Sequence, residues 1–340
     1  MACQLEAMSL SQQRLANSLI SWKLISARLR EFPAIGKAFP ERLLREFDDK
    51  PPFCAHYMAW RLGTWKGKAH FERLNSLLEH AANLPGWSSE RSLLRSAEYG
   101  DYWSLVWQLQ VAEYLSSVGS DVLWLGGGPD LQVNVQDSRV FVECLCYRKY
   151  YALELFLEDV TQVLGADIRA ERSSFLPLLL RDGKAREPLI SRALEPFLDT
   201  SLMAAKREEA RLHWPVEVSA AGPIRFYLEG PGDSEYVPSL ANAHGDVLTF
   251  MTEALADAVK KKSSANDLQS HRPNLLAINL LLANETSIVD PASVPLKDPL
   301  PNSLDGVAVV TLGIDAALSR PHLRLLRSRM PDHPAKAFTS

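Results

Sequence analysis

Two carboxylates stand in a part of the sequence that predicts a tight pair of antiparallel strands. Asp130 opens the segment DLQVNV, in which apolar and polar residues alternate, and Glu143 lies within the β-branched and aromatic segment RVFVECLC. Twelve residues separate the two carboxylates, and the short run Gln136-Asp137-Ser138 between the segments predicts a hairpin turn. Since neighbouring strands lie about 4.8 Å apart, the hairpin places Asp130 and Glu143 side by side.

Two carboxylates this close repel each other unless a proton or a cation lies between them. Mg²⁺ and Mn²⁺ prefer oxygen ligands, and either ion can polarise a phosphate and lower the pKa of a bound water. Glu143 is flanked by Val142 and Cys144, and a carboxylate in an apolar strand is unexpected unless it is paired or liganded. We therefore expect Asp130 and Glu143 to be metal ligands. The alternative for Asp130, which follows Gly128-Pro129, is a purely turn-forming role.

A helix, three strands, a second helix and further strands are predicted around this pair. We expect helices over 102–117 and 247–262, and strands over 121–125, 130–135, 139–146, 275–282 and 307–312. The first of these helices is apolar around most of its circumference, which is typical of a helix between two layers. The predicted fold class is therefore α/β with a mixed sheet.

This arrangement resembles the PD-(D/E)xK, or restriction-endonuclease-like, nucleases. The resemblance rests on Pro129-Asp130, on Glu143 and on the order helix, three strands, helix, strand (αβββαβ). It covers residues 98–149 well and 247–283 loosely. It implies a nuclease whose Asp130 and Glu143 hold Mg²⁺ or Mn²⁺ at the edge of the sheet, and whose substrate is DNA or RNA.

Two positions depart from the pattern of that family. The lysine expected two residues after the glutamate is replaced by Leu145, on the same side of the strand as Glu143. The glutamate that the family often carries on its first helix is replaced by Gln108. Glu113 lies on the same predicted helix, on the opposite side from Gln108, and is kept as a candidate third metal ligand.

In some members of the family the lysine comes from a neighbouring element. Three lysines, Lys260–Lys262, end the second predicted helix, which in this fold packs beside the second and third strands. We expect one of them to take the catalytic role of the missing lysine, with Lys261 and Lys262 as the chosen candidates. Arg148 and Lys149 are alternatives just past the third strand. A solvated helix terminus, favoured by the helix dipole, is the plain structural explanation for the lysine run.

The remaining sequence predicts a helical module and an elaboration of the α/β domain. Helices are expected over 9–31, 41–47, 56–62 and 70–84, with the first ending at Pro33. The predicted domains are a helical N-terminal module over 1–97, the α/β domain over 98–327 and a loose tail over 328–340. Within the elaboration, at about 150–246, we expect helical segments over 153–164 and 189–212 and strands over 216–218 and 224–229.

Composition limits the class of protein. Of 340 residues, 46% are apolar and 23% are charged, which excludes wholesale disorder. The four cysteines have no metal-site or disulfide spacing, so we expect free thiols in a reducing compartment. The first 30 residues show no secretory signal, and no apolar run approaches the roughly 20 residues of a membrane span. We therefore expect a soluble, cytoplasmic protein.

Charge is distributed unevenly along the chain. Residues 1–97 hold 14 Lys and Arg against 9 Asp and Glu, whereas residues 98–165 hold 3 against 10. This indicates either two differently solvated surfaces or a polyanion-facing module beside a carboxylate site. The helical module is accordingly expected to contact nucleic acid, a protein partner or a second copy of the chain.

Two functions remain open from the sequence. The first is a metal-dependent nuclease, or a nuclease-derived protein, that hydrolyses phosphodiester bonds. The second is a catalytically inactive nuclease-like fold that serves as a scaffold for nucleic acid or protein. Leu145 and Gln108 favour the second function, because neither side chain carries the charge of the family residue whose position it occupies.

Overall fold

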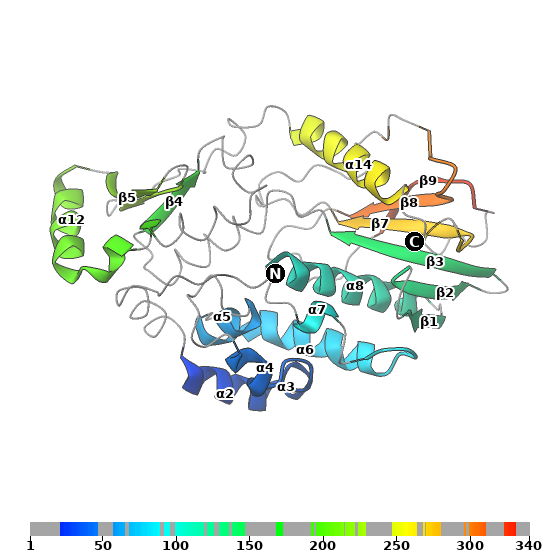
Figure 1. Cartoon of the computed structure of the whole chain (residues 1–340), viewed down its shortest axis with the longest axis horizontal. Coiled ribbons are helices and arrows are strands. Elements are labelled where there is room, and N and C mark those ends of the chain that lie inside the picture. The colour runs from blue at the N-terminus through cyan, green and yellow to red at the C-terminus, as the bar shows by residue number, and fades with distance from the viewer. Residues whose placement is uncertain are drawn as a thin grey trace.

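A computed structural model describes most of the predicted core (Figure 1). The described residues are 21–46, 57–64, 68–88, 92–95, 99–118, 121–125, 129–135, 138–146, 168–172, 192–193, 195–213, 215–221, 224–228, 247–263, 268, 270–279, 296, 299–310 and 323–330. None of the helices in these ranges has the length and apolar composition needed to cross a membrane.

A six-stranded mixed sheet forms the centre of the α/β part. Its strands, in spatial order, are β1 (Asp121–Trp124), β2 (Leu131–Val135), β3 (Ser138–Cys146), β7 (Asn274–Asn279), β8 (Gly306–Val310) and β9 (Arg324–Ser328). Strands β1, β2 and β3 run antiparallel, β3, β7 and β8 run parallel, and β9 returns antiparallel to β8. The predicted mixed α/β class is confirmed. The sequence does not predict β9, because RLLRS lacks a regular alternation of polar and apolar residues.

Two long helices cover opposite faces of this sheet (Figure 1). They are α8 (Tyr99–Ser117) and α14 (Val247–Ser263). On the α8 face, Trp107 donates its indole N–H to the carbonyl of Ala277 in β7, at 3.2 Å. Alternation along β3 turns Cys144 toward α8 and Glu143 toward α14. Strand β3 is thus covered on both faces, and a charged side chain on it must find a partner.

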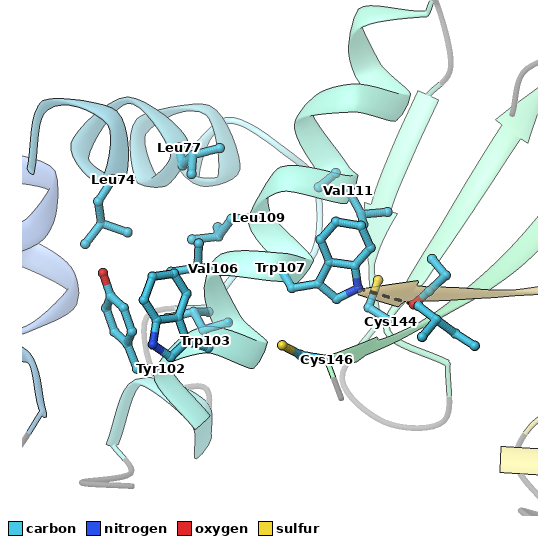
Figure 2. Close-up of a cluster of buried hydrophobic side chains, with 14 of the residues drawn as sticks. Leu74, Leu77, Tyr102, Trp103, Val106, Trp107, Leu109, Val111, Cys144 and Cys146 are labelled. Atoms are coloured by element: carbon cyan, nitrogen blue, oxygen red, sulfur yellow. Dashed lines mark hydrogen bonds between the residues drawn. The ribbon is translucent and has the colours of Figure 1, made fainter. Parts of the chain in front are cut away.

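The core beneath α8 is apolar and includes two cysteines. Figure 2 shows Trp107 and Val111 of α8 above Cys144 of β3. Cys144 and Cys146 are both buried, and neither forms a disulfide bond within the described part of the chain. Cys3 and Cys54 lie outside the described residues.

Helices make up the described part of the chain before β1. They are α2 (Trp22–Glu31), α3 (Pro33–Ala38), α4 (Glu41–Arg45), α5 (Tyr57–Thr64), α6 (Lys68–Ala82) and α7 (Ser92–Arg95). The sequence does not predict α3, because Pro33 is expected to end a helix, whereas here it also begins the next one. Proline is favoured at a first helical position, where its missing N–H costs nothing. Helices α5, α6 and α7 pack against α8; the domain boundary at residue 97 stays a prediction.

A buried polar cluster joins these helices to α8. His70 of α6 lies between Arg61 of α5 and Tyr102 of α8, with its Nδ1 3.4 Å from the Arg61 guanidinium and its Nε2 2.6 Å from the Tyr102 hydroxyl. Because a guanidinium only donates, Nδ1 accepts and the proton resides on Nε2. Burial, and secondarily the charge of Arg61, holds the pKa of His70 well below its usual range. His70 is therefore neutral in the folded chain.

A tight turn after α6 covers the outer edge of β1. The amide of Trp124 donates to the carbonyl of Pro85, at 2.9 Å, so part of the exposed edge is paired by the helical module. The next residue, Gly86, has φ of +77°, and a Cβ there would lie 2.1 Å from the Trp124 carbonyl oxygen. Only glycine combines a favourable positive φ with the absence of a Cβ atom, so this turn requires glycine at position 86.

The predicted elaboration contains a second, three-stranded antiparallel sheet. Its strands are β4 (Ile168–Arg172), β6 (Ile224–Leu228) and β5 (Val216–Ala221), in that order, with the 3₁₀ turn η2 (Glu195–Leu198) and α12 (Thr200–Leu212) beside them. The strands predicted near 216 and 224 are confirmed, and β4 is not predicted. Asp199 caps α12 by accepting from the amides of Ser201 and Leu202, so the helix begins later than predicted. The helix predicted over 153–164 lies outside the described residues.

Candidate functional site

The hairpin of β2 and β3 brings Asp130 beside the peptide bond between Glu143 and Cys144. The ladder pairs Leu131 with Val142, and the same register continued by one residue pairs Asp130 with Glu143. The ladder ends at Leu131, and Asp130 contacts β3 through its side chain instead: Oδ2 of Asp130 accepts from the amide of Cys144, at 2.8 Å. Its backbone carbonyl also accepts from the amide of Leu125, at 3.0 Å. Asp130 is therefore held from both neighbouring strands.

A third contact to Asp130 comes from α8. Nε2 of Gln108 donates to Oδ1 of Asp130, at 2.8 Å, and Gln108 is only 5% exposed. Within the described part of the chain, the other amide atom, Gln108 Oε1, is buried without a hydrogen-bond partner. A buried carbonyl oxygen without a donor is costly, so the carboxylate of Asp130 dictates which way the amide faces.

Glu143 occupies the opposite face of β3. It is 9% exposed and lies in the middle of the strand, level with Leu276 of β7. Two residues on, Leu145 is partly buried and packs against the apolar core, on the same face as Glu143. A carboxylate in such surroundings requires a cation or a donor.

Lys262 supplies that partner. In the last turn of α14, its Nζ contacts Oε1 of Glu143. The Lys262 and Glu143 side chains are 25% and 11% exposed, so water screens this pair much less than it screens a surface pair. Lys260 and Lys261, in the same turn, are exposed. The structure thus brings one of the predicted lysines, Lys262, to the predicted glutamate.

Glu113 lies elsewhere. Arg73 of α6 contacts both of its carboxylate oxygens, at 2.6 Å for the pair Nη1 and Oε1, in a bidentate ion pair that is mostly buried. This pair holds Glu113 on the α6 side of α8, whereas Gln108 holds Asp130. The structure does not bring Glu113 to Asp130 and Glu143. Arg148 and Lys149 lie outside the described residues.

Two carboxylates belong to this site, Asp130, which contacts α8, and Glu143, which contacts α14. Asp130 and Glu143 offer carboxylate oxygens, and Mg²⁺ commonly binds to one or two carboxylates while keeping several waters. Across the described ranges, no group of three or more His, Cys, Asp and Glu side chains that could hold a metal ion is present. With Lys262 in place, the three charged groups sum to a formal charge of −1.

Sequence reasoning missed the contacts that fix Asp130. The family resemblance placed Gln108 at the position of the family's helix glutamate, but gave no sign that its amide donates to Asp130. The backbone contact from Cys144 leaves no mark in the sequence, because any residue type supplies an amide. The available signal was a glutamine on a helix that is apolar around most of its circumference.

Comparisons with known proteins give no relative. No protein-family model matches the chain, no curated protein matches it, and no solved structure matches it. The arrangement of residues in the site is therefore what carries an inference about function.

Proposed function

We propose that this chain is a divalent-cation-dependent nuclease, or a protein derived from one, acting on phosphodiester bonds of nucleic acid. The observation that carries the proposal is the contact of Lys262 with Glu143, immediately beside Asp130. Asp130, which precedes β2, contacts the backbone of β3 next to Glu143, and Glu143 contacts a lysine from α14. Segments this far apart in sequence have no local reason to converge on a buried carboxylate.

The order and direction of the elements support a restriction-endonuclease-like core. Helix α8, strands β1 to β3, helix α14 and strand β7 occur in this order along the chain, with β4, η2, α12, β5 and β6 inserted between β3 and α14, and β3 and β7 are parallel. That order matches the αβββαβ pattern in which the PD-(D/E)xK resemblance places its acids. The support comes from topology alone, and the fold does not by itself determine activity.

Each residue has a separate part in the proposed reaction. Asp130 and Glu143 would hold Mg²⁺ or Mn²⁺, which when bound supplies a Lewis acid for a phosphate oxygen and lowers the pKa of water. Gln108 and the Cys144 amide keep the Asp130 carboxylate in a fixed orientation. Lys262, which contacts Glu143, would supply the positive charge that Leu145 cannot supply.

The helical module offers basic side chains for the phosphate backbone. Lys23 and Arg30 of α2, Lys37 of α3 and Arg42 of α4 are exposed. Phosphate contacts of this kind provide sequence-independent affinity that weakens as salt rises. This supports nucleic acid as the substrate class within the proposal.

A second function, a catalytically inactive scaffold, is favoured by two observations. Both carboxylate oxygens of Asp130 already accept hydrogen bonds, and Glu143 already has an ammonium partner. Leu145 fills the position of the family's strand lysine with an apolar side chain. Such a chain would bind nucleic acid or protein without cleaving it.

The test is a cleavage assay with Mn²⁺ or Mg²⁺ on plasmid, single-stranded DNA and RNA. Wild type is compared with Asp130→Asn and Glu143→Gln, and with Asp121→Asn as a control for the loss of an exposed carboxylate. Cation-dependent cleavage that both site variants lose, and Asp121→Asn retains, is the expected result. Each variant is first checked for folding by circular dichroism.

Two other outcomes reject the proposed activity. If no substrate is cut by the folded wild-type chain with either cation, the scaffold function is favoured. If cleavage persists in Asp130→Asn and Glu143→Gln, the assigned residues are wrong. Filter binding on the same substrates then reports whether the chain binds nucleic acid at all.

A further inference from the structure

One oxygen of Glu143 has two competing uses. Oε1 of Glu143 contacts the ammonium of Lys262, and within the described residues Lys262 is the only ion-pair partner of Glu143. A divalent cation held by this carboxylate needs the same oxygen atoms. Two cations attracted to one carboxylate also repel each other.

Lys262 has a competing use as well. While its ammonium contacts Glu143, part of its hydrogen-bonding capacity and charge is directed to the protein rather than to a phosphate. A lysine that serves the substrate has to be turned away from its carboxylate partner. Binding of a divalent cation to Glu143 would account for both requirements, because it would occupy the carboxylate and displace the ammonium of Lys262 from it.

We propose that the ammonium of Lys262 and a divalent cation compete for the carboxylate of Glu143. Lys262 contacts Glu143 until Mg²⁺ or Mn²⁺ displaces it, and the displaced ammonium then contacts the substrate phosphate. This inference rests on the proposed cation site and adds to it a coupling between cation binding and the lysine. The coupling makes the lysine available only when the cation is present.

The two partners differ in their freedom to move. Glu143 is fixed in β3, an interior strand of the sheet, where it pairs with Leu276 of β7. Lys262 has a four-carbon stem, lies in the last turn of α14 and has a side chain that is 25% exposed. Lys260, in the same turn, is exposed. Displacement therefore moves the lysine and leaves the strand in place.

The end of α14 gives the released ammonium a favourable location. The C-terminal end of a helix carries a partial negative charge from its last carbonyl groups, and lysine near this end is stabilised. Lys262 lies one residue before the last residue of α14, Ser263. A displaced Lys262 keeps this interaction while leaving Glu143.

The first test measures the reactivity of single lysines in the wild-type chain. The full chain is treated briefly with acetic anhydride, with and without saturating Mn²⁺, and peptides are quantified by mass spectrometry. We expect labelling of Lys262 to rise several-fold with Mn²⁺, whereas labelling of the exposed Lys260 stays constant. Mn²⁺ that binds without changing the labelling of Lys262 overturns the proposal.

The second test measures the affinity for Mn²⁺ by calorimetry. Removing the competitor in Lys262→Met is expected to tighten binding about tenfold, equivalent to about 1.4 kcal/mol, and to reduce any cleavage. Lys260→Met is the matched control, with unchanged affinity. Lys262→Arg keeps the charge and is expected to bind Mn²⁺ within about threefold of wild type. Because loss of any nearby positive charge favours a cation, tighter binding supports the proposal only together with the Mn²⁺-dependent labelling of Lys262, and unchanged or weaker binding in Lys262→Met overturns it.

These outcomes separate the inference from the proposed function. Mn²⁺ binding that exposes Lys262 without any cleavage keeps the inference and rejects the nuclease. Cleavage with a Lys262 reactivity that ignores Mn²⁺ keeps the nuclease and rejects the inference. Absence of Mn²⁺ binding to both wild type and Lys262→Met rejects the inference outright.

Discussion

Asp130 is expected to stabilise the fold whatever its chemistry. Its carboxylate accepts from Gln108 Nε2 and from the amide of Cys144, both at 2.8 Å. Asp130→Ala removes the acceptor for both donors, and a hydrogen bond to a charged group contributes about 1.5–3 kcal/mol. Partial replacement by water lowers the sum, so the expected loss of unfolding free energy is about 2–4 kcal/mol.

Asp130→Asn is expected to cost about 1 kcal/mol or less. The new amide keeps one oxygen for the Cys144 amide and turns its Nδ2 to Gln108. The Gln108 amide then rotates and presents Oε1, the atom that has no partner in the described part of the chain. The asparagine variant thus removes the charge and keeps the hydrogen bonds, which makes it suitable for the activity assay.

Urea unfolding followed by tryptophan fluorescence measures both effects. Trp107 and Trp124 are buried next to this part of the sheet and report its loss. Asp121→Ala, at an exposed position of β1, is the matched control and is expected within about 0.5 kcal/mol of wild type. The reasoning is refuted if Asp130→Ala is as stable as this control, or if Asp130→Asn loses as much as Asp130→Ala.

Three further predictions follow from single contacts. Gly86→Ala is expected to lower the unfolding free energy by about 2–4 kcal/mol, since its Cβ would lie 2.1 Å from the Trp124 carbonyl oxygen at a φ of +77°; a thermal melt close to wild type would contradict this. His70 has a depressed pKa in the folded chain, so the unfolded chain takes up more protons and stability falls as pH drops below about 6.5, by up to about 1.4 kcal/mol per pH unit. His70→Gln should flatten the urea-derived slope between pH 6.5 and 5, and an unchanged slope would show that His70 is not buried neutral. Gln108→Glu adds a third carboxylate beside Asp130 and is expected to raise Mn²⁺ affinity about tenfold by calorimetry, whereas unchanged or weaker binding counts against a cation site.

The sequence predicts elements with strong periodicity and misses short or irregular ones. Helix α8 and the hairpin of β2 and β3 follow from apolar patterns, and both are confirmed. Strand β4 (IRAER) is short and rich in charge, so its pairing with β6 leaves little trace in the pattern. Helix α3 is missed because Pro33 at its start is indistinguishable from a terminator of α2.

The candidate site is predicted in its residue types and not in its contacts. A run of three lysines does not reveal which one faces Glu143, because that choice depends on how α14 is rotated against the sheet. In the same way, Glu113 is near Gln108 in sequence, yet the structure pairs it with Arg73 of α6. Pairing of this kind depends on packing between elements far apart in the chain.

The most direct test of the central claim is the rate at which the chain nicks a plasmid as Mn²⁺ is titrated, in wild type and Glu143→Gln. The account predicts cleavage that rises with Mn²⁺ in wild type and falls about a hundredfold or more in Glu143→Gln, while Asp121→Asn matches wild type. Equal rates in wild type and Glu143→Gln, or no cleavage by folded wild type at any Mn²⁺ concentration, would contradict it.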